Sequence, residues 1–255
     1  MNTPQRVVIT AGGAGIGRAL ALAFHASGAR VAVCDIDANT IAELAEIQPE
    51  IIGRVANVTD ADDMAAFLGD VDAAFGGVDV ALANAGTGGP AGPIESLDVD
   101  DWRACISANL DGAFLLCQWA AAHMKAQKSG SIILTSSTAG MFGYPMRSPY
   151  ATAKWGVIGL MKTLACELGP YGVRVNAICP GAVEGDRMER VLKNEAAAKS
   201  QDIEDVRQIY VKGVSMRTWV SADDIADAAL FLTSPAASKI SGLAMPVDGH
   251  TESIT

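Results

Sequence analysis

The sequence has no apolar run long enough to cross a membrane. Half of its 255 residues are hydrophobic, but they are spread along the chain, and the longest uncharged stretch, residues 129–146, is rich in Ser, Thr and Gly. A membrane-spanning helix needs about 20 consecutive apolar residues. The first residues also lack a basic region followed by an apolar segment, which is the pattern of an export signal. We therefore expect a cytoplasmic protein with no membrane partner.

Basic residues are scarce relative to acidic ones. Lys and Arg total 19 against 29 Asp and Glu, which gives a formal net charge of −10. The phosphate backbone of a nucleic acid repels such a chain, and no cluster of Lys or Arg stands out to offset that repulsion. We therefore expect no nucleic-acid partner.

Paired cysteines and clustered histidines are also missing. Five cysteines and three histidines lie far apart, and no Cys-x-x-Cys pair occurs. An odd number of cysteines in a chain without an export signal indicates reduced thiols, each expected to act as a small core residue. No zinc ligand set can be written from these residues, so we expect no bound metal. They are Cys34, Cys105, Cys117, Cys166, Cys179, His25, His123 and His250.

What the chain does have is a regular alternation of apolar β-branched runs with segments of helical period. Strands that are apolar throughout need cover on both faces of their sheet. Repeated strand–helix units therefore predict a doubly wound parallel α/β sheet, with helices on both faces, in a single domain spanning residues 1–255. The expected strands are 6–10, 30–35, 51–56, 78–83, 131–135, 173–178 and 243–247. The expected helices include 15–27, 38–47, 61–75, 102–125 and 150–168.

One late segment differs from the rest in composition. Residues 184–217 contain 14 charged side chains, seven of each sign, in 34 positions. A solvated pair of helices explains that charge. The position of the segment, between the last two expected strands, also suits a mobile lid over a site, which we place at about residues 184–218.

A glycine-rich turn follows the first expected strand. Residues 10–17 read Thr-Ala-Gly-Gly-Ala-Gly-Ile-Gly and lead directly into a helix. Glycines let a backbone approach a pyrophosphate closely, and a helix N-terminus supplies free N–H groups and a positive dipole end. A glycine cluster alone could be a flexible loop, but a strand-to-helix junction is the context that a phosphate-binding turn requires.

The second expected strand ends in Asp35, about 20 residues after this turn. A carboxylate there can accept hydrogen bonds from both hydroxyls of an adenosine ribose, and it repels a 2′-phosphate. Neither Ala14 nor Ile36 is basic, so nothing adjacent offers a 2′-phosphate a partner. The pattern predicts that NAD is preferred over NADP.

Tyr150 and Lys154 open a helical segment at a spacing that puts both side chains on one face. An ammonium group stabilises a nearby phenolate and lowers the pKa of a tyrosine from its reference value near 10, which makes the phenol useful as an acid or base. Taken alone, Tyr-x-x-x-Lys usually marks a surface helix. Here Ser137 follows the strand that ends at Thr135, and ligands bind at the carboxyl ends of strands in open α/β sheets.

Together these motifs resemble the short-chain dehydrogenase/reductase family, in order and in spacing, over nearly the whole chain. The family is built on the three-layer Rossmann fold, so the resemblance implies that fold. The matching positions are Thr10 to Gly17, Asn84 to Gly86, Asn109, Ser137, Tyr150 with Lys154, and Pro180 with Gly181.

The resemblance implies a catalytic tetrad and a nicotinamide cofactor. Tyr150 would be the general acid/base, Ser137 would hydrogen-bond the substrate oxygen, and Lys154 would tune Tyr150 and hold the nicotinamide ribose. Asn109 would fix a water that relays protons. Asn57 and Val58 would flank the adenine, and residues 180–183 would contact the nicotinamide. The cofactor-binding residues implied are Gly12, Gly15, Ile16, Gly17, Asp35, Ile36, Asn57, Val58, Asn84, Ala85, Gly86, Tyr150, Lys154, Pro180, Gly181 and Val183.

Several positions depart from the family pattern. Ala11 replaces the first glycine of the turn, which we expect to be tolerated through a negative φ and a slight repositioning of the loop. Asn57 stands where Asp is commoner, and its amide oxygen is expected to accept from the adenine amino group. Ala83 replaces an asparagine with a mainly structural role. Gly185 takes the place of a threonine that holds the carboxamide, so a backbone group or another lid residue must replace that contact.

The tetrad implies an NAD-dependent interconversion of a secondary alcohol and a ketone, without naming the substrate. The mixture of polar and apolar candidates suits a sugar, polyol or hydroxy acid. Arg187 could pair with an anionic group of the substrate, or with an acidic residue on the lid surface. The candidate substrate-binding residues are Ser137, Thr138, Tyr144, Arg147 and Arg187.

Alternatives to this reading remain. A 3-oxoacyl-type reductase usually draws on NADPH, which Asp35 opposes. A nucleotide-binding regulator or scaffold would not need the tetrad, and an isomerase or dehydratase of the same superfamily is generally longer. Family members are usually homotetramers, which the apolar faces of residues 114–122 and 155–164 would fit, although a buried monomer core has the same pattern.

Overall fold

A parallel sheet of seven strands crosses the part of the chain that the structure, a computed structural model, describes: residues 3–199 and 201–252. The strand order is β3-β2-β1-β4-β5-β6-β7, so the chain winds outward from β1 in one direction and then from β4 in the other. The strands are β1 (Arg6–Thr10), β2 (Arg30–Asp35), β3 (Ile52–Val55), β4 (Val80–Ala83), β5 (Gly130–Thr135), β6 (Val173–Pro180) and β7 (Ala244–Val247).

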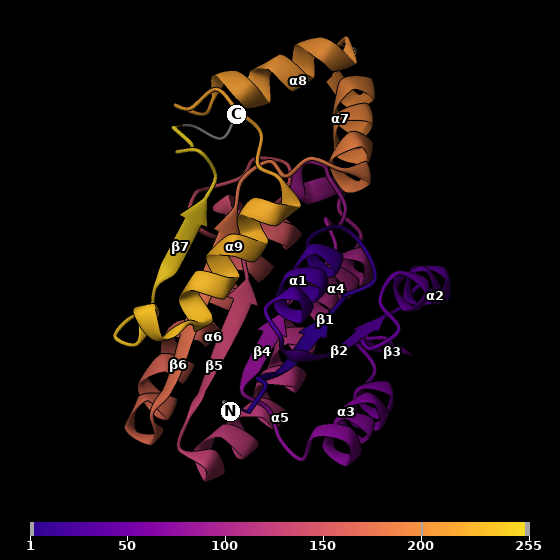
Figure 1. The fold of residues 1–255 in the computed structure, drawn as a ribbon. Coiled ribbons are helices and arrows are strands. Elements are labelled where there is room, and N and C mark those ends of the chain that lie inside the picture. Colours follow the sequence, from indigo (N-terminus) through magenta and orange to yellow (C-terminus); the bar gives the residue numbers. More distant parts are fainter. Residues whose placement is uncertain (1–2, 200, 253–255) are drawn as a thin grey trace.

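Helices cover both faces of this sheet (Figure 1). The helices on one face are α1 (Gly15–Ala26), α2 (Ala38–Ile47) and α9 (Ala222–Thr233). Those on the other are α3 (Ala61–Phe75), α4 (Val99–Ile106), α5 (Gly112–Gln127) and α6 (Ser148–Leu168). The predicted three-layer Rossmann fold is therefore confirmed. Within the described ranges, no helix has the length and apolar character that a membrane crossing needs.

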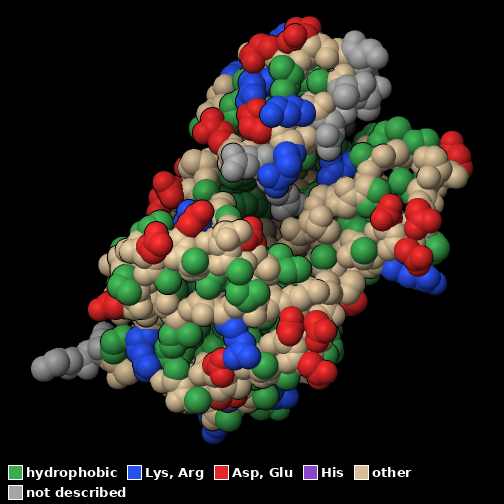
Figure 2. All heavy atoms as spheres, turned by 90° about the vertical axis from the view of Figure 1, so that its right-hand side faces the viewer, with side chains coloured by type: hydrophobic (Ala, Val, Ile, Leu, Met, Phe, Trp, Pro, Cys, Tyr) green, Lys and Arg blue, Asp and Glu red, His purple; other side chains and the backbone are tan. Residues whose placement is uncertain are grey.

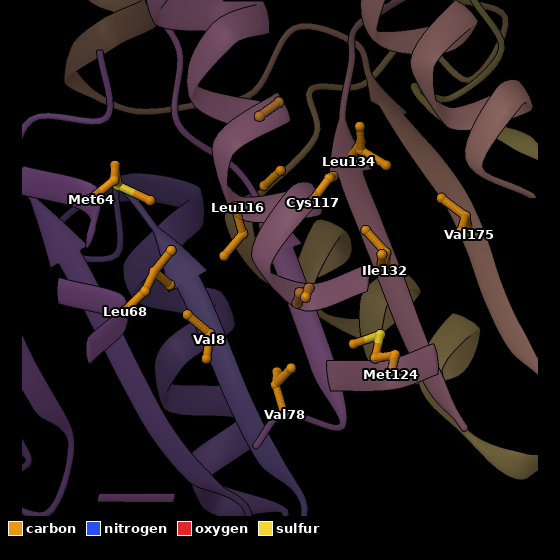
Figure 3. Close-up of a cluster of buried hydrophobic side chains, with 14 of the residues drawn as sticks. Val8, Met64, Leu68, Val78, Leu116, Cys117, Met124, Ile132, Leu134 and Val175 are labelled. Carbon is orange, nitrogen blue, oxygen red and sulfur yellow. The ribbon is translucent and has the colours of Figure 1, made fainter. Parts of the chain in front are cut away.

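Strands β1, β2, β4, β5 and β6 each contribute to two separate cores, one on each side of the sheet. Val7 and Ile9 of β1 point into the core under α1 and α9, whereas Val8 between them points into the core under α3, α5 and α6. Figure 3 shows the second core, in which Val8 and Ile132 of the sheet face Leu116 of α5. This two-sided burial is why the strands are apolar at successive positions and not at every second one.

The helix expected at residues 102–125 is divided in the structure. Helix α4 ends at Ile106, and a π-helical turn, Ser107–Asp111, leads into α5 at Gly112. The wider turn carries Asn109, which is only 1% exposed. Hydrophobic periodicity predicts that a segment is helical, but it does not show where a single turn widens from the α-helical to the π-helical hydrogen-bond pattern.

The charged segment forms two helices, α7 (Asp186–Lys199) and α8 (Ile203–Lys212), above the carboxyl ends of the strands (Figure 1). Three of its buried residues, Leu192, Ala196 and Val206, form a small cluster separate from the two main cores. The base of the segment is fixed to the strand ends, since Glu184 N–H donates to Val220 O (2.8 Å) and Val220 N–H donates to Ala182 O (3.1 Å). We call residues 184–217 the α7–α8 segment.

The cysteines are free thiols, but not all are core residues as expected. Burial raises the pKa of Cys34 and of Cys117 to about 12, so both stay protonated at neutral pH. Cys166, however, lies exposed on α6, so the prediction that each cysteine is buried is wrong at that position.

An ion pair at the amino end of the sheet joins β1 to β4. Arg6 donates from Nε and Nη2 to the two oxygens of Asp79 (2.9 and 2.7 Å), and Arg6 N–H donates to the same carboxylate (2.9 Å). Partial burial by itself raises the pKa of Asp79, but the hydrogen bonds from Arg6 outweigh it, and the pKa lies below its usual value. Gln127 at the end of α5 connects to this pair through Arg6 Nη2 (2.7 Å).

We predict that Asp79→Asn lowers the free energy of unfolding at neutral pH by about 1 kcal/mol, since it weakens a charge-assisted pair. Because the native pKa of Asp79 is lowered, the stabilisation is present above the unfolded pKa of about 4 and is lost as the pH falls below it. Urea unfolding of both proteins at descending pH measures the difference, which should shrink on acidification. The control, Asp70→Asn, removes an exposed carboxylate paired with Arg54 and should cost less. A difference that stays constant with pH contradicts the prediction.

Candidate active site

The loops that follow β1, β4 and β5 are tied together by one asparagine. Asn84 donates from Nδ2 to the carbonyls of Thr10 and Ala11 (3.2 Å each), and Asn84 Oδ1 accepts from the Thr135 hydroxyl (3.3 Å). The Thr10 hydroxyl oxygen in turn accepts from the N–H groups of Asn84 and Ala85 (3.1 Å each). Three neighbouring strand ends thus have fixed positions at the carboxyl edge of the sheet.

The glycine-rich turn after β1 leaves no space for a side chain at three of its positions, Gly12, Gly13 and Gly17. A Cβ on Gly17 would lie 1.8 Å from Ala11 O, and one on Gly12 would lie 2.5 Å from Val33 Cβ. Gly15 has φ +51° and nothing within 4 Å of a Cβ, so it combines a left-handed backbone with open space. Helix α1 starts at this residue, and no side chain caps its N-terminus. The turn and the helix end therefore offer free N–H groups to a phosphate.

Ala11 has φ +52°, so the expectation of a negative φ is wrong. The turn keeps a left-handed residue directly after β1, and the alanine adopts that conformation because its neighbours hold it in place. Gly12 N–H donates to Cys34 O of β2 (2.9 Å), and Ala11 O accepts from Asn84. A left-handed L-residue costs roughly 1–2 kcal/mol, which the surrounding bonds offset.

Asp35 lies at the end of β2 beside the turn. Its Oδ2 accepts from Gly13 N–H (3.0 Å) and its Oδ1 accepts from Asp37 N–H (3.2 Å). Ile36 next to it is 69% exposed. Sequence reasoning missed Arg18, whose Nε donates to Gly13 O (2.6 Å) and whose Nη2 pairs with Glu43 (2.7 Å). That basic residue reaches the turn, but a carboxylate on α2 already neutralises it.

The two residues predicted to flank an adenine lie between β3 and α3. Val58 packs where a Cβ on Gly112 would be, 2.8 Å away. Asn57 Oδ1 accepts from both the N–H and the hydroxyl of Thr59 (3.0 and 2.9 Å), which occupies the acceptor that we expected to bind the adenine amino group. That expectation needs correction, since the side-chain NH₂ of Asn57 is the group left to interact with a base.

Tyr150 and Lys154 share one face of α6, as their spacing predicts. Lys154 Nζ lies 5.7 Å from the centre of the Tyr150 ring and donates to Thr135 O at the end of β5 (2.9 Å). The Lys154 side chain is buried, with 3% exposed. The Ser136 hydroxyl donates to the Lys154 carbonyl (2.9 Å), so β5 positions this lysine through both its backbone and its side chain.

Ser137 follows β5 directly and is 9% exposed. Its hydroxyl oxygen accepts from Ala139 N–H (3.2 Å) and so caps the 3₁₀ turn Thr138–Gly140. A Cβ on Gly140 would lie 2.4 Å from Ser136 Oγ and 2.8 Å from Lys154 O, so this turn packs tightly against α6. The end of β5 therefore places Ser137 and Lys154 in one compact unit.

Asn109 joins this unit from the π-helical turn. Its Nδ2 donates to the carbonyls of Thr87 (2.9 Å) and Cys105 (2.8 Å), while its buried Oδ1 has no hydrogen-bond partner in the described part of the chain. A Cβ on Gly86 would lie 2.4 Å from Asn109 Oδ1 and 3.2 Å from Lys154 Nζ. An acceptor oxygen and an ammonium group thus approach each other across Gly86, which has no side chain to separate them.

The strand end of β6 supplies the opposite side of the site. Gly181 N–H donates to Val247 O (3.1 Å), and a Cβ on Gly181 would lie 2.8 Å from Asp248 Cβ, so β6 and β7 hold the Pro180–Gly181 corner in place. Val183 bridges to Val220 at the base of the α7–α8 segment. Gly185 has φ +130° and open space around it. A threonine there would be strained, so this backbone conformation suits the glycine.

Two aromatic residues join the substrate side of the site to the α7–α8 segment. The Tyr144 hydroxyl lies 3.2 Å from the Tyr210 hydroxyl of α8, and the Tyr210 ring stacks on Trp219 at 6.0 Å. Arg147 lies beside Tyr144 and Tyr150. Sequence reasoning missed Tyr210, because only the fold brings α8 over residue 144. The side chain of Arg187, a predicted substrate residue, lies outside the described part of the structure, and Thr138 begins the 3₁₀ turn after Ser137.

Residues 10–250 match a family model described as enoyl-(acyl carrier protein) reductase. Among characterised relatives, levodione reductase of Leifsonia aquatica is 32% identical over 97% of this chain and 94% of its own length. A probable galactose dehydrogenase of Rhizobium meliloti (strain 1021) is 36% identical over 95% and 93%. A 3-oxoacyl-[acyl-carrier-protein] reductase of Thermotoga maritima (strain MSB8) is 32% identical over 95% of both chains.

Solved structures agree with the sequence relatives. The crystal structure of levodione reductase superposes with a TM-score of 0.90 at 32% identity, covering 98% of both chains. NAD⁺-bound xylitol dehydrogenase superposes with a TM-score of 0.91 at 29% identity, covering 95% of this chain and 97% of that one. Both matches extend over the sheet, the helices on its two faces and the loops at its carboxyl edge.

We predict that Ala11→Gly raises the free energy of unfolding by about 0.5–1 kcal/mol. Glycine removes a left-handed cost of about 1–2 kcal/mol but adds about 0.4–1 kcal/mol of freedom to the unfolded chain. Ala11→Val serves as the opposing variant, because a β-branched residue tolerates this φ less well than alanine, and it should lower the stability. Urea titrations measure both variants. A less stable Ala11→Gly protein contradicts the strain argument.

Proposed function

The chain belongs to the short-chain dehydrogenase/reductase family, and from this premise we propose that it is an NAD-dependent oxidoreductase that interconverts a secondary alcohol and a ketone. The observation that carries the proposal is the convergence of Tyr150, Lys154 and Asn109 with the end of β5, next to a glycine turn that opens a helix. The named relatives include enzymes that reduce carbonyl groups or oxidise sugars, which supports this reaction class.

The residues at the carboxyl edge fit a dinucleotide. Gly12 and Gly17 keep the turn narrow, and Gly15 leaves open space in front of the α1 N-terminus, where a pyrophosphate would be bound by N–H groups. Asp35 would accept from the ribose hydroxyls, and Ile36, Val58 and the Asn57 amide would surround the base. Residues 84–86 and 180–183 would line the nicotinamide end. When bound, the nicotinamide supplies or accepts the hydride.

Asp35 supports NAD over NADP. Its carboxylate is fixed at the end of β2 by two backbone N–H groups, so its negative charge cannot turn away from a 2′-phosphate. Arg18, the basic side chain that reaches the turn, is engaged by Glu43. A 2′-phosphate would therefore meet an immobile anion.

In the catalytic step, Tyr150 moves the proton of the reacting oxygen. It would remove the proton from the alcohol in oxidation and return it to the ketone in reduction, while the Ser137 hydroxyl holds the same oxygen. Lys154 would stabilise the phenolate, because its buried ammonium group lies 5.7 Å from the Tyr150 ring and is held there by Thr135 O. The chain's contribution is orientation and charge at the reacting centre.

Asn109 would connect this proton to solvent. Its Nδ2 is anchored by two carbonyls, so the orphan Oδ1 is turned toward Lys154 Nζ across Gly86. A buried acceptor without a partner is costly, and a bound water that donates to Oδ1 and accepts from Nζ would satisfy that acceptor. We propose that this water relays the Tyr150 proton.

The proposed substrate is a small polar alcohol: a sugar, a polyol or a hydroxy acid. The candidate groups on this side of the site are polar or amphipathic, namely Thr138, Tyr144, Arg147 and, from α8, Tyr210. A 3-oxoacyl-type reductase is the second candidate, favoured by the relative from Thermotoga maritima. Asp35 opposes it if that work requires NADPH.

We further propose a cytoplasmic homotetramer. Phe114 of α5 and Trp155 of α6 are 47% and 50% exposed on one face of the sheet, and Phe231 of α9 and Leu243 before β7 are 43% and 40% exposed elsewhere. Two separate apolar areas suit two interfaces, which is what a tetramer of identical chains needs.

We predict that Tyr150→Phe lowers kcat/KM by about 10²–10⁴-fold, because the variant keeps the ring but loses the group that transfers the proton. A fluorescence titration should show that NADH still binds. Tyr171→Phe is the matched control, since Tyr171 is an exposed tyrosine at the far end of α6. If Tyr150→Phe retains wild-type turnover, the proposed acid/base is wrong.

We predict that Asp35→Ala lowers the ratio of the Kd for NADPH to the Kd for NADH by about 10–100-fold, the equivalent of one or two charge-assisted hydrogen bonds. Titrations of the wild-type protein and the variant with both dinucleotides measure this ratio. Asp37→Ala removes an adjacent carboxylate that caps α2 and should leave the preference in place. Tighter binding of NADPH by the wild-type protein would reject the assignment of NAD and favour the 3-oxoacyl reductase.

A further inference from the structure

Arg147 has an unusual position immediately before the catalytic helix. Its guanidinium carbon lies 5.3 Å from the centre of the Tyr150 ring and 5.5 Å from that of Tyr144. The preceding residue, Met146, has φ +63°, a conformation that methionine rarely adopts, and its carbonyl accepts from Gly92 N–H (2.8 Å). The loop therefore bends sharply and brings Arg147 against the catalytic tyrosine.

Most of the hydrogen-bonding capacity of Arg147 is unused. Its Nη2 donates to Gly88 O (2.8 Å), which is its one hydrogen bond from the guanidinium to the described part of the chain. Its Nε is buried and has no acceptor there. A guanidinium carries five N–H donors, so four remain. Leaving such a donor buried and unpaired costs about 1–3 kcal/mol, which a structure retains where a ligand supplies the acceptor.

Among the side chains that the structure describes, Arg147 also has no carboxylate within ion-pair distance, although the chain carries an excess of ten negative charges. Three other arginines, Arg6, Arg18 and Arg207, each bind a carboxylate. The groups that surround Arg147 are instead two phenol rings and a backbone carbonyl.

We propose that Arg147 binds a carboxylate of the substrate, so that the enzyme acts on a hydroxy acid. This inference rests on the proposed function and selects one of its three substrate classes. Arg147 presents a planar fork of N–H donors that matches a carboxylate, and it stands at the start of α6, three residues before Tyr150 and seven before Lys154. The face of the molecule beneath α7 and α8 is hollowed (Figure 2), and Arg147 packs on Tyr144, whose hydroxyl meets Tyr210 of α8.

The geometry also sets how far the carboxylate of the substrate lies from its carbinol carbon. Tyr150 takes the proton of the carbinol oxygen, and Arg147 packs on the ring of that same residue. A carboxylate held by Arg147 is therefore close to the carbinol carbon, as it is in 2-hydroxy and 3-hydroxy acids. The Tyr144–Tyr210 contact closes the same side from above, and its two hydroxyls can accept or donate to the remaining oxygens of the substrate.

The test compares substrates that differ only in the acidic group. Lactate is matched with 1,2-propanediol, and 3-hydroxybutyrate with 1,3-butanediol; each pair has the same secondary alcohol. We expect the wild-type protein to prefer the acid, and Arg147→Met to lower the ratio of kcat/KM for acid to kcat/KM for diol by about 10–100-fold. Arg147→Lys keeps the positive charge but loses the planar set of N–H donors. Its ratio of kcat/KM for acid to kcat/KM for diol should therefore lie between those of the wild-type protein and Arg147→Met.

Arg103→Met is the matched control, because it removes the same charge from an exposed position on α4 and should leave the ratio unchanged. If Arg147 only supports Tyr150 through its ring contact, Arg147→Met slows acid and diol equally and the ratio stays constant, which overturns the proposal. A wild-type preference for the diols overturns it as well.

A binding experiment separates this proposal from the function on which it rests. Calorimetry of oxamate and of malonate added to the protein–NADH complex should give a measurable Kd with the wild-type protein that weakens by about 10–100-fold in Arg147→Met. If NADH itself does not bind, the proposed function fails. If NADH binds and both proteins bind these anions equally well, or neither does, the carboxylate site alone is rejected.

Discussion

The site depends on a polar tie between the ends of three neighbouring strands. Asn84 bonds to β1 through two carbonyls and to β5 through Thr135, whose own carbonyl holds Lys154. The glycine turn and the catalytic lysine are thus positioned by the same short set of hydrogen bonds, most of them at least partly buried. Because such bonds are strong in a low-dielectric interior and costly to leave unmade, the strand ends have one favourable arrangement. The tie also holds Ala11 in the left-handed backbone that the turn needs.

The fold was predictable because the alternation of an apolar strand segment with a helical segment recurs along the chain. Most strands are apolar at successive positions and are followed by a helical segment, so the two-sided sheet follows from burial alone. The placement of the proposed catalytic residues was predictable for a related reason: Ser137 follows a strand, and the spacing of Tyr150 and Lys154 puts both on one helix face. What the pattern could not show was backbone detail. The π-helical turn at residues 107–111 and the positive φ of Ala11 each depend on contacts from distant strands, which no local period records.

The same limit applies to groups whose role depends on their partners. Asn57 lies in the loop after β3 that is expected to contact an adenine, but Thr59 occupies the acceptor oxygen of its side chain. The residue type of Asn57 alone does not reveal this local contact. Tyr210 lies 66 residues from Tyr144, and only the position of α8 brings the two hydroxyls together. Arg18 reaches the glycine turn, but its pairing with Glu43 of α2 decides that its charge is not free to bind a phosphate. In each case the sequence indicates the chemical type of the side chain. It does not show which other residue the side chain contacts, or whether that contact already occupies its hydrogen-bonding or charged group.

The proposed catalytic groups and the proposed substrate-binding groups lie in parts of the molecule that are stabilised by different hydrophobic cores. Lys154, Asn109 and Ser137 are buried against strand ends that belong to the main cores, so their geometry is coupled to the stability of the whole sheet. Tyr210 belongs instead to the α7–α8 segment, whose own core comprises three buried residues in the described part of the chain, Leu192, Ala196 and Val206. A small cluster of this kind opens at lower free energy than a main core. Under the proposed function, substitutions in this segment should change which alcohol is accepted without displacing Tyr150 and Lys154. Arg147 stands at the boundary, since its backbone starts the catalytic helix while its side chain contacts Tyr144, the residue that meets α8.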